Sequence, residues 1–250
     1  MSKEITVKAL ESKGLLAKYL VKNASAPLLN SLRRVMQSDV PTLAIEEVTI
    51  SENNSILFDE FLTQRLGLIP LTTDLKSYAL GDSIVLTLEK EGPATVYSRE
   101  IKSKDPKVKV VGNAPIVKLG KGQKVRLELK AVMGKGKEHA KWSPGVFSYR
   151  PVAELNISEN AGEEAVKACP KHILEKKGKK VVLTDSLACD ACAACVDSSG
   201  SENISLSISD TDFVFSIESF GQLECDEIIA KGIELLREKT EEFKKAVGKL

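Results

Sequence analysis

This sequence has few histidines and almost no excess of either charge. It contains two histidines, and neither lies in a motif with a nucleophile or at metal-ligand spacing. Lys and Arg number 36 against 35 Asp and Glu, which leaves a formal net charge of +1. Proteins that bind nucleic acid without sequence preference normally carry a strong basic surplus. The composition argues against that class, and we expect no direct sequence-specific contact with DNA.

Motifs for catalysis on phosphates are missing as well. A nucleotidyl transferase needs clustered carboxylates that hold magnesium at the phosphates. The sequence has no Asp-x-Asp-x-Asp cluster and no P-loop. We therefore expect a chain without an active site of its own, although it can still belong to a larger enzyme.

Long apolar runs are also absent. No run approaches the length of a membrane span, and the first residues, MSKEITVKAL, lack the apolar core of a signal peptide. The apolar fraction of 42% is ordinary for a globular protein and suffices for a sizeable core. We expect a cytoplasmic protein without membrane contact. In that compartment clustered cysteines more often hold metal than form disulfides.

Two segments have the spacing of amphipathic helices. The stretch SAPLLNSLRRVMQSDV begins with Ser25, a plausible N-cap, and we expect a helix over residues 26–40. A second, long helix is expected from about Asp226 to the end of the sequence. In both, apolar residues recur at three- and four-residue steps, so each helix has one apolar face. These residues are Leu28, Leu29, Leu32, Val35, Met36, Ile229, Ile233, Leu236, Phe243 and Val247.

The remaining pattern is mostly that of strands. Residues 4–22 predict two strands around a turn, and residues 82–157 predict a β-rich region. The clearest alternation runs through Val125, Leu127, Leu129 and Ala131, and a later one through Phe213, Phe215 and Ile217. The stretch FDEFLTQRLGLIPL predicts a short helix that Asp59 caps and that Gly67 ends in a left-handed conformation.

The cysteines form the most specific motif. Cys189, Cys192 and Cys195 make a C-x-x-C-x-x-C run, and Cys169 lies upstream, directly before Pro170. An iron–sulfur cubane needs four thiolates; such a run supplies three, and in bacterial-type ferredoxins the fourth cysteine precedes a proline. The pattern predicts that these four cysteines hold one [4Fe–4S] cluster.

Alternatives to that cluster remain open. Ser199 stands where a ligand of a second cluster would lie, so we expect one cluster, with a [3Fe–4S] form if Cys169 is displaced or oxidised. Zinc is the less expected metal, because its sites usually present two C-x-x-C knuckles. A disulfide pair is the third option. The fifth cysteine, Cys225, is expected to be a small buried apolar residue.

Two further motifs point to a family. NSLRRVMQSDVPTLAIEEVTISENNSILFDEFLTQRLGLIPL at 30–71 and GKGKEHAKWSPG at 134–145 closely resemble the archaeal family of alpha-like subunits of DNA-directed RNA polymerase. That family is the counterpart of bacterial alpha and of the third-largest subunit of eukaryotic polymerase II. The strand and long helix at the C-terminal end also resemble it, so the resemblance covers essentially the whole chain.

The resemblance implies an α+β fold of three parts. It implies an alpha-subunit-like dimerisation domain from residues 1–44 and 203–250, a β-rich insertion domain over 45–157, and an inserted ferredoxin-like iron–sulfur domain over 158–202. The last segment has few large apolar residues, so ligation rather than burial is expected to order it.

The resemblance also implies partners. The chain would form a heterodimer with subunit L, and that pair would be the platform for the large catalytic subunits and small accessory subunits. Loop 134–145 would contact a large subunit, unless it is a mobile solvated loop. The alternative function is a ferredoxin-type electron-transfer protein. The shared core with subunit L is expected to contain Leu28, Leu29, Leu32, Val35, Met36, Ile229, Ile233, Leu236 and Phe243.

Overall fold

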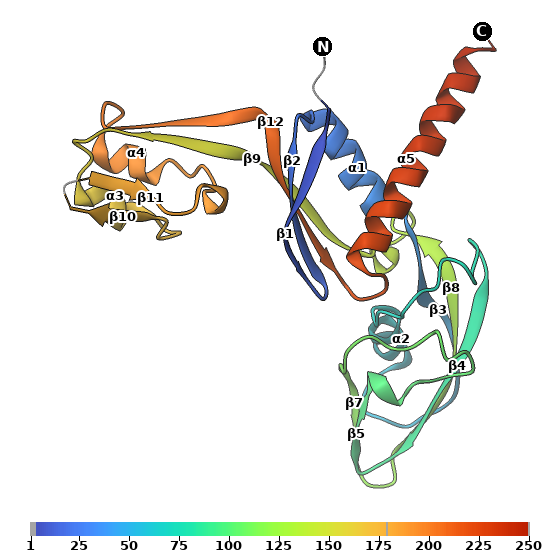
Figure 1. Ribbon diagram of the computed structural model, residues 1–250. Coiled ribbons are helices and arrows are strands. Elements are labelled where there is room, and N and C mark those ends of the chain that lie inside the picture. Colours follow the sequence, from blue (N-terminus) through green and yellow to red (C-terminus); the bar gives the residue numbers. More distant parts are fainter. Residues whose placement is uncertain (1–3, 179, 250) are drawn as a thin grey trace. The chain divides into compact units, whose positions relative to one another are not determined.

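The protein is described by a computed structural model that covers residues 4–178 and 180–249 (Figure 1). It mixes helices with strands and is mostly sheet, as expected. No helix among the described residues is long and apolar enough to cross a bilayer. The chain forms two compact units. As far as the structure describes them, the first unit comprises Met1–Ser12, Ala17–Asn30 and Ser148–Ser216, and the second comprises Lys13–Leu16, Ser31–Phe147 and Ile217–Leu250.

One sheet has four strands in the order β1-β2-β12-β9. Its strands are β1 (Thr6–Lys13), β2 (Leu16–Lys22), β12 (Ile204–Ser219) and β9 (Gly145–Ile157). The two strands expected near the N-terminus are thus confirmed, and Gly14 turns between them at φ +56°. The strand expected around Phe213 is confirmed as part of β12, but burial does not alternate there, because Val214 is buried together with Phe213 and Phe215. The Phe213 ring meets that of Tyr149 edge to face at 5.9 Å.

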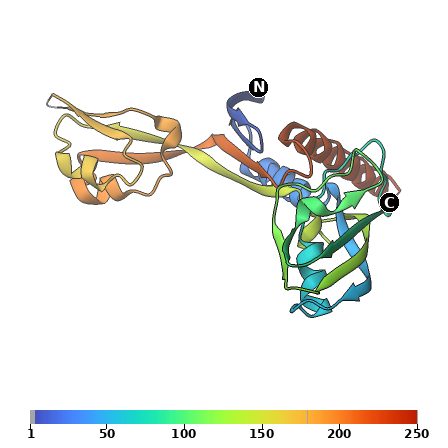
Figure 2. The ribbon, with the colours of Figure 1, turned by 90° about the horizontal axis from the view of Figure 1, so that it is seen from below.

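The cysteine segment adds a small hairpin and two short helices to the first unit (Figures 1 and 2). Strand β10 (Leu174–Lys177) pairs antiparallel with β11 (Lys180–Leu183), and the helices are α3 (Glu163–Ala168) and α4 (Ala194–Ser199). The buried cluster here consists largely of small residues, among them three of the cysteines. Burial alone therefore offers this segment less stabilisation than a core of leucines would.

The second unit contains a four-stranded sheet in the order β3-β8-β4-β6 and a two-stranded sheet, β5-β7. The strands are β3 (Pro41–Asn53), β4 (Ser83–Glu91), β5 (Ala94–Tyr97), β6 (Lys102–Ser103), β7 (Pro115–Leu119) and β8 (Lys124–Lys135). The predicted alternation in β8 is confirmed, because Val125, Leu127, Leu129 and Ala131 are each at most 3% exposed. These side chains form part of the largest core.

The short helix α2 (Asp59–Gly67) buries Leu62 and Leu66, but both of its predicted ends are wrong. The N-cap is Phe58, which makes no side-chain cap bond, and Asp59 is already helical. Gly67 is the last helical residue and is not left-handed. A Cβ at Gly67 would lie 3.4 Å from the carbonyl oxygen of Ile45, an ordinary contact distance, so neither its backbone conformation nor its surroundings require glycine here.

Both long helices expected from the sequence are present as α1 (Ala26–Ser38) and α5 (Cys225–Val247). The part of α1 that belongs to the second unit, residues 31–38, lies beside α5 (Figure 1). They approach closely at Gly232, where a Cβ would lie only 2.5 Å from Met36 Cγ. An ion pair of 3.0 Å between Lys239 and Asp39 fixes the same crossing. The domain boundaries expected from the sequence remain a prediction.

Candidate functional site

All four cysteines of the predicted cluster site line one hollow in the first unit. Cys169 directly follows α3, Cys189 directly follows a 3-10 turn, and Cys195 lies in the first turn of α4. Cys192 lies in the loop between the last two. The fifth cysteine, Cys225, is buried at the start of α5 in the second unit, as expected, with its Sγ 3.5 Å from a backbone oxygen.

The backbone near the cysteines takes an unusual course. Ala191 and Ala193 both have a left-handed conformation, at φ +58° and +61°, and His172 has φ +51°. Each such non-glycine residue costs roughly 1–3 kcal/mol, and such strain concentrates at functional sites. The two alanines alternate with Cys192, so the strained turns wind the C-x-x-C-x-x-C run around the hollow. Alanine gives no sequence signal for this conformation.

The four thiols differ in access to solvent. Cys169, Cys189 and Cys195 are 7–8% exposed, whereas Cys192 is exposed. Burial raises the pKa of the Cys195 thiol, with the nearby cysteines adding to the effect. Without a bound cation this thiol is therefore held in its neutral form more strongly than a free cysteine.

The donor set is one of soft ligands. Thiolates suit zinc and iron–sulfur clusters. Among residues 4–178 and 180–249, no three His, Cys, Asp or Glu side chains meet the geometry for a single metal ion. The four cysteines nevertheless line a common hollow. By the chemistry of the donors, three cysteines of the strained segment and Cys169 beside the same hollow are the ligand types that an iron–sulfur cluster uses.

The turn before Cys189 is held from two sides. The carboxylate of Asp185 accepts hydrogen bonds from the backbone N–H groups of Leu187 and Ala188, at 2.9 and 3.2 Å. From strand β9, Arg150 donates to the backbone oxygens of Leu187 and Cys189, the latter at 2.5 Å. Sequence reasoning missed Arg150, because it lies 39 residues before the cysteine whose turn it holds.

Helix α5 has two apolar rows. Ile228 and Gly232 are buried, and Gly232 lies against Met36 and Leu32 of α1. The row predicted from the sequence is largely uncovered: Ile233, Phe243 and Val247 are 52%, 72% and 51% exposed. Ile229 and Leu236, in the same row, are half-buried. The three-four spacing of this row is that of a helix-packing seam.

Helix α1 exposes fewer apolar side chains to a partner than its sequence pattern implies. Leu29, Val35 and Met36 are 4%, 6% and 0% exposed, so the chain itself covers them. Leu32 is half-buried and Leu28 is 41% exposed. Of the α1 residues expected in a shared core, these two offer a surface, and the partner role of all five remains a prediction.

The loop over residues 134–145 is packed at both ends, whereas residues 137–140 in its middle are exposed. Trp142 is 6% exposed, donates from its indole Nε1 to the Val132 carbonyl oxygen at 3.0 Å, and stacks below Lys141 at 4.5 Å. Lys141 also pairs with Glu46 of β3. A Cβ at Gly134 would lie 2.4 Å from the Trp142 ring, so the glycine makes room for the tryptophan. The Trp142 side chain is thus buried by contacts within this chain.

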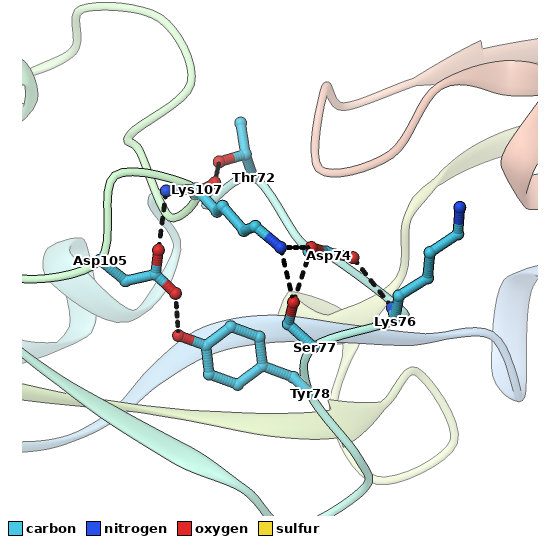
Figure 3. Close-up of polar contacts among 7 residues, drawn as sticks. All are labelled: Thr72, Asp74, Lys76, Ser77, Tyr78, Asp105 and Lys107. Atoms are coloured by element: carbon cyan, nitrogen blue, oxygen red, sulfur yellow. Dashed lines mark hydrogen bonds and ion pairs between the residues drawn. The ribbon is translucent and has the colours of Figure 1, made fainter.

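A polar cluster that the sequence did not indicate joins two loops of the second unit (Figure 3). Lys107 Nζ lies 2.6 Å from the Asp74 carboxylate, and this bond is the main cause of the lowered pKa of Asp74. Tyr78 donates to Asp105 at 2.6 Å. Burial, followed by the Asp105 carboxylate, raises the pKa of Tyr78 to about 12. These contacts tie the loop after β3 and α2 to the loop before β7.

The matching family model and the similar proteins are all described as RNA polymerase subunits or domains of them. A family model described as the RNA polymerase Rpb3/RpoA insert domain matches residues 48–148. The chain is 36% identical to DNA-directed RNA polymerase subunit Rpo3 of Methanosarcina acetivorans, over 97% of both proteins. Subunit Rpo3 of Pyrococcus furiosus is 37% identical over 98% of both. Subunit Rpo3 of Thermococcus kodakarensis is 35% identical, over 98% of this chain and 99% of the relative.

Proposed function

This chain belongs to the Rpo3 family, the archaeal alpha-like subunits of DNA-directed RNA polymerase, and from that premise we propose that it is a non-catalytic assembly subunit. In this role it forms a heterodimer with subunit L. The pair is the platform on which the large catalytic subunits and the small accessory subunits dock. A ferredoxin-type electron-transfer protein is not favoured, since that function leaves the similarity over 97% of the chain unexplained.

The uncovered row of α5 is the observation that carries the assembly role. Three large apolar side chains, Ile233, Phe243 and Val247, stand more than half exposed at helix-packing intervals. Exposed apolar surface of this kind is typical of protein interfaces. The other apolar row of α5, with Ile228 and Gly232, is already buried within the chain. The uncovered row is therefore available to subunit L, and Leu28 and Leu32 offer further apolar surface on α1.

Assembly by this platform is testable by omission. The polymerase is reconstituted from purified subunits with and without this chain, and the mixtures are separated by size. With the chain present, the large subunits are expected to co-elute with it and with subunit L. If the large subunits assemble into an active polymerase equally well without the chain, the assembly role is wrong.

The second part of the proposal concerns the cysteines. Cys169, Cys189, Cys192 and Cys195 hold one [4Fe–4S] cluster, and the segment of hairpin β10–β11 with α3 and α4 is a ferredoxin-like domain. The strained loop and the small local core support this, because ligation energy then orders a segment that buries little apolar surface. When bound, the cluster supplies one-electron redox chemistry, while the chain's residues hold it and limit its contact with water.

Counting metal and sulfide tests the cluster. Protein prepared and reconstituted without oxygen is expected to contain about four irons and four sulfides per chain, with a paramagnetic signal after reduction. Three irons per chain would indicate the [3Fe–4S] form. Zinc without sulfide would overturn the iron–sulfur assignment and would mean that the four cysteines bind zinc.

A further inference from the structure

The cluster proposed above would have a positioning residue outside the cysteine motif. Arg150 lies on β9 and is partly buried. Its Nη1 donates to the carbonyl oxygen of Cys189 at 2.5 Å, and its Nη2 donates to that of Leu187. A guanidinium presents its donors as a rigid planar fork, so one side chain bridges two carbonyls that face the same direction.

The bridged carbonyls lie at the end of a short helical turn. The 3-10 turn spans Ser186–Ala188, and Cys189 is its C-cap. Carbonyl groups at the end of a helical turn lack partners within it and need outside donors. Asp185 fixes the start of the turn through two backbone N–H groups, and Arg150 fixes its end. The position of Cys189 is therefore set from both sides before any cluster binds.

The positive charge of Arg150 gives it a second effect. Arg150 does not line the cysteine hollow itself, but its guanidinium lies 2.5 Å from the carbonyl oxygen of Cys189, which does. The charged residues that line the hollow, Lys171 and Asp190, form an ion pair of 3.8 Å with each other. A cluster with four thiolate ligands carries net negative charge, and its reduction potential depends on nearby charge and on hydrogen bonds.

We propose that Arg150 is a positioning residue for the cluster: it holds the turn of Cys189 through a two-point hydrogen bond and raises the reduction potential through its charge. The inference rests on the cluster assigned to the four cysteines above. Groups that orient metal ligands in this way typically change metal retention by about 10- to 100-fold when they are removed.

The test compares full-length wild-type protein with Arg150→Gln, Arg150→Lys and the control Arg126→Gln. Arg126 lies on β8 in the second unit and pairs with Glu89. All four proteins are reconstituted anaerobically with iron and sulfide. Three quantities are measured: iron and sulfide per chain, the rate at which excess chelator bleaches the visible absorption, and the midpoint potential.

Arg150→Gln is expected to lose its cluster about 10-fold faster than wild type and to have a lower midpoint potential. Arg150→Lys is expected to lose the cluster faster as well, because an ammonium group cannot bridge two carbonyls as a planar fork, but to keep a potential near that of wild type. Arg126→Gln should match wild type in both. If Arg150 acted only in folding, replacing it would leave the midpoint potential of the cluster unchanged.

The outcomes distinguish a failure of the cluster assignment from a failure of the role proposed for Arg150. Wild-type protein that takes up no iron and sulfide would overturn the cluster itself. Wild-type protein that loads normally, together with Arg150 variants that match it in bleaching rate and potential, would overturn only the role of Arg150. If circular dichroism shows that Arg150→Gln does not fold, Arg150→Lys decides, and a wild-type bleaching rate in that variant contradicts the two-point bridge.

Discussion

Removing the exposed row of α5 tests the proposed interface most sharply. Ile233 and Phe243 are 52% and 72% exposed, so the chain alone gains little from them and a partner has much left to cover. The perturbation is the double variant Ile233→Ser with Phe243→Ser. Because both side chains are more than half exposed, the unfolding midpoint of the double variant should stay close to that of wild type.

The expected loss of affinity follows from the exposed fractions. Complete burial of such a side chain is worth about 1.5–3 kcal/mol. Scaled by what remains exposed, Ile233 offers about 1 kcal/mol and Phe243 about 1.5–2 kcal/mol to a partner. Together they amount to about 3 kcal/mol, which corresponds to a Kd for subunit L about 100-fold weaker.

The assay is titration calorimetry of each variant with purified subunit L. Glu238→Ser is the matched control, because residue 238 lies five positions from both 233 and 243 and so on the opposite side of the helix. Its affinity should stay within about twofold of wild type, which is the range expected for a surface side chain outside the contact. A double variant that binds as tightly as wild type, or a control that weakens equally, would refute the interface.

Three further predictions concern other parts of the chain. Gly134→Ala should lower the free energy of unfolding in urea by about 1–3 kcal/mol, because its Cβ meets the rigid Trp142 ring; an unchanged midpoint would contradict that packing. Burial, followed by the bond to Asp105, raises the pKa of Tyr78 from 10.0 to about 12, so the stability that depends on its protonated hydroxyl is complete below pH 10 and is lost as the pH rises towards 12. The stability advantage of wild type over Tyr78→Phe should therefore shrink across that window in denaturant titrations, and a constant difference speaks against it. In metal-free protein iodoacetamide should label Cys192 first, as mass spectrometry of peptides can show; uniform labelling would mean that the burial of the other thiols is wrong.

The elements that the sequence predicted well are those with a local period. The alternation in β8 and the apolar spacing of α1 and α5 depend only on neighbouring residues, and each element was found where expected. The four cysteines that the sequence grouped by their spacing line one hollow, and their role as cluster ligands stays a prediction. It did not indicate which apolar row of α5 would be covered, since that depends on where α1 crosses at Gly232.

What the sequence could not predict depends on contacts between distant residues. The pairing of Arg150 with the turn of Cys189 requires β9 to lie beside the cysteine segment, and no local pattern records that. The end of α2 was misread because Gly67 stays helical and Leu68, in a right-handed conformation, is the C-cap, so the helix ends without a left-handed residue. The left-handed alanines 191 and 193 were missed because alanine normally avoids that conformation.

The most direct measurement is the molar mass, by light scattering, of this chain alone and after mixing with an equal amount of subunit L. If the uncovered row of α5 is the docking surface of an assembly subunit, the mixture forms a stable complex with one copy of each chain. Two separate species at the masses of the individual chains, over the micromolar range, would contradict it.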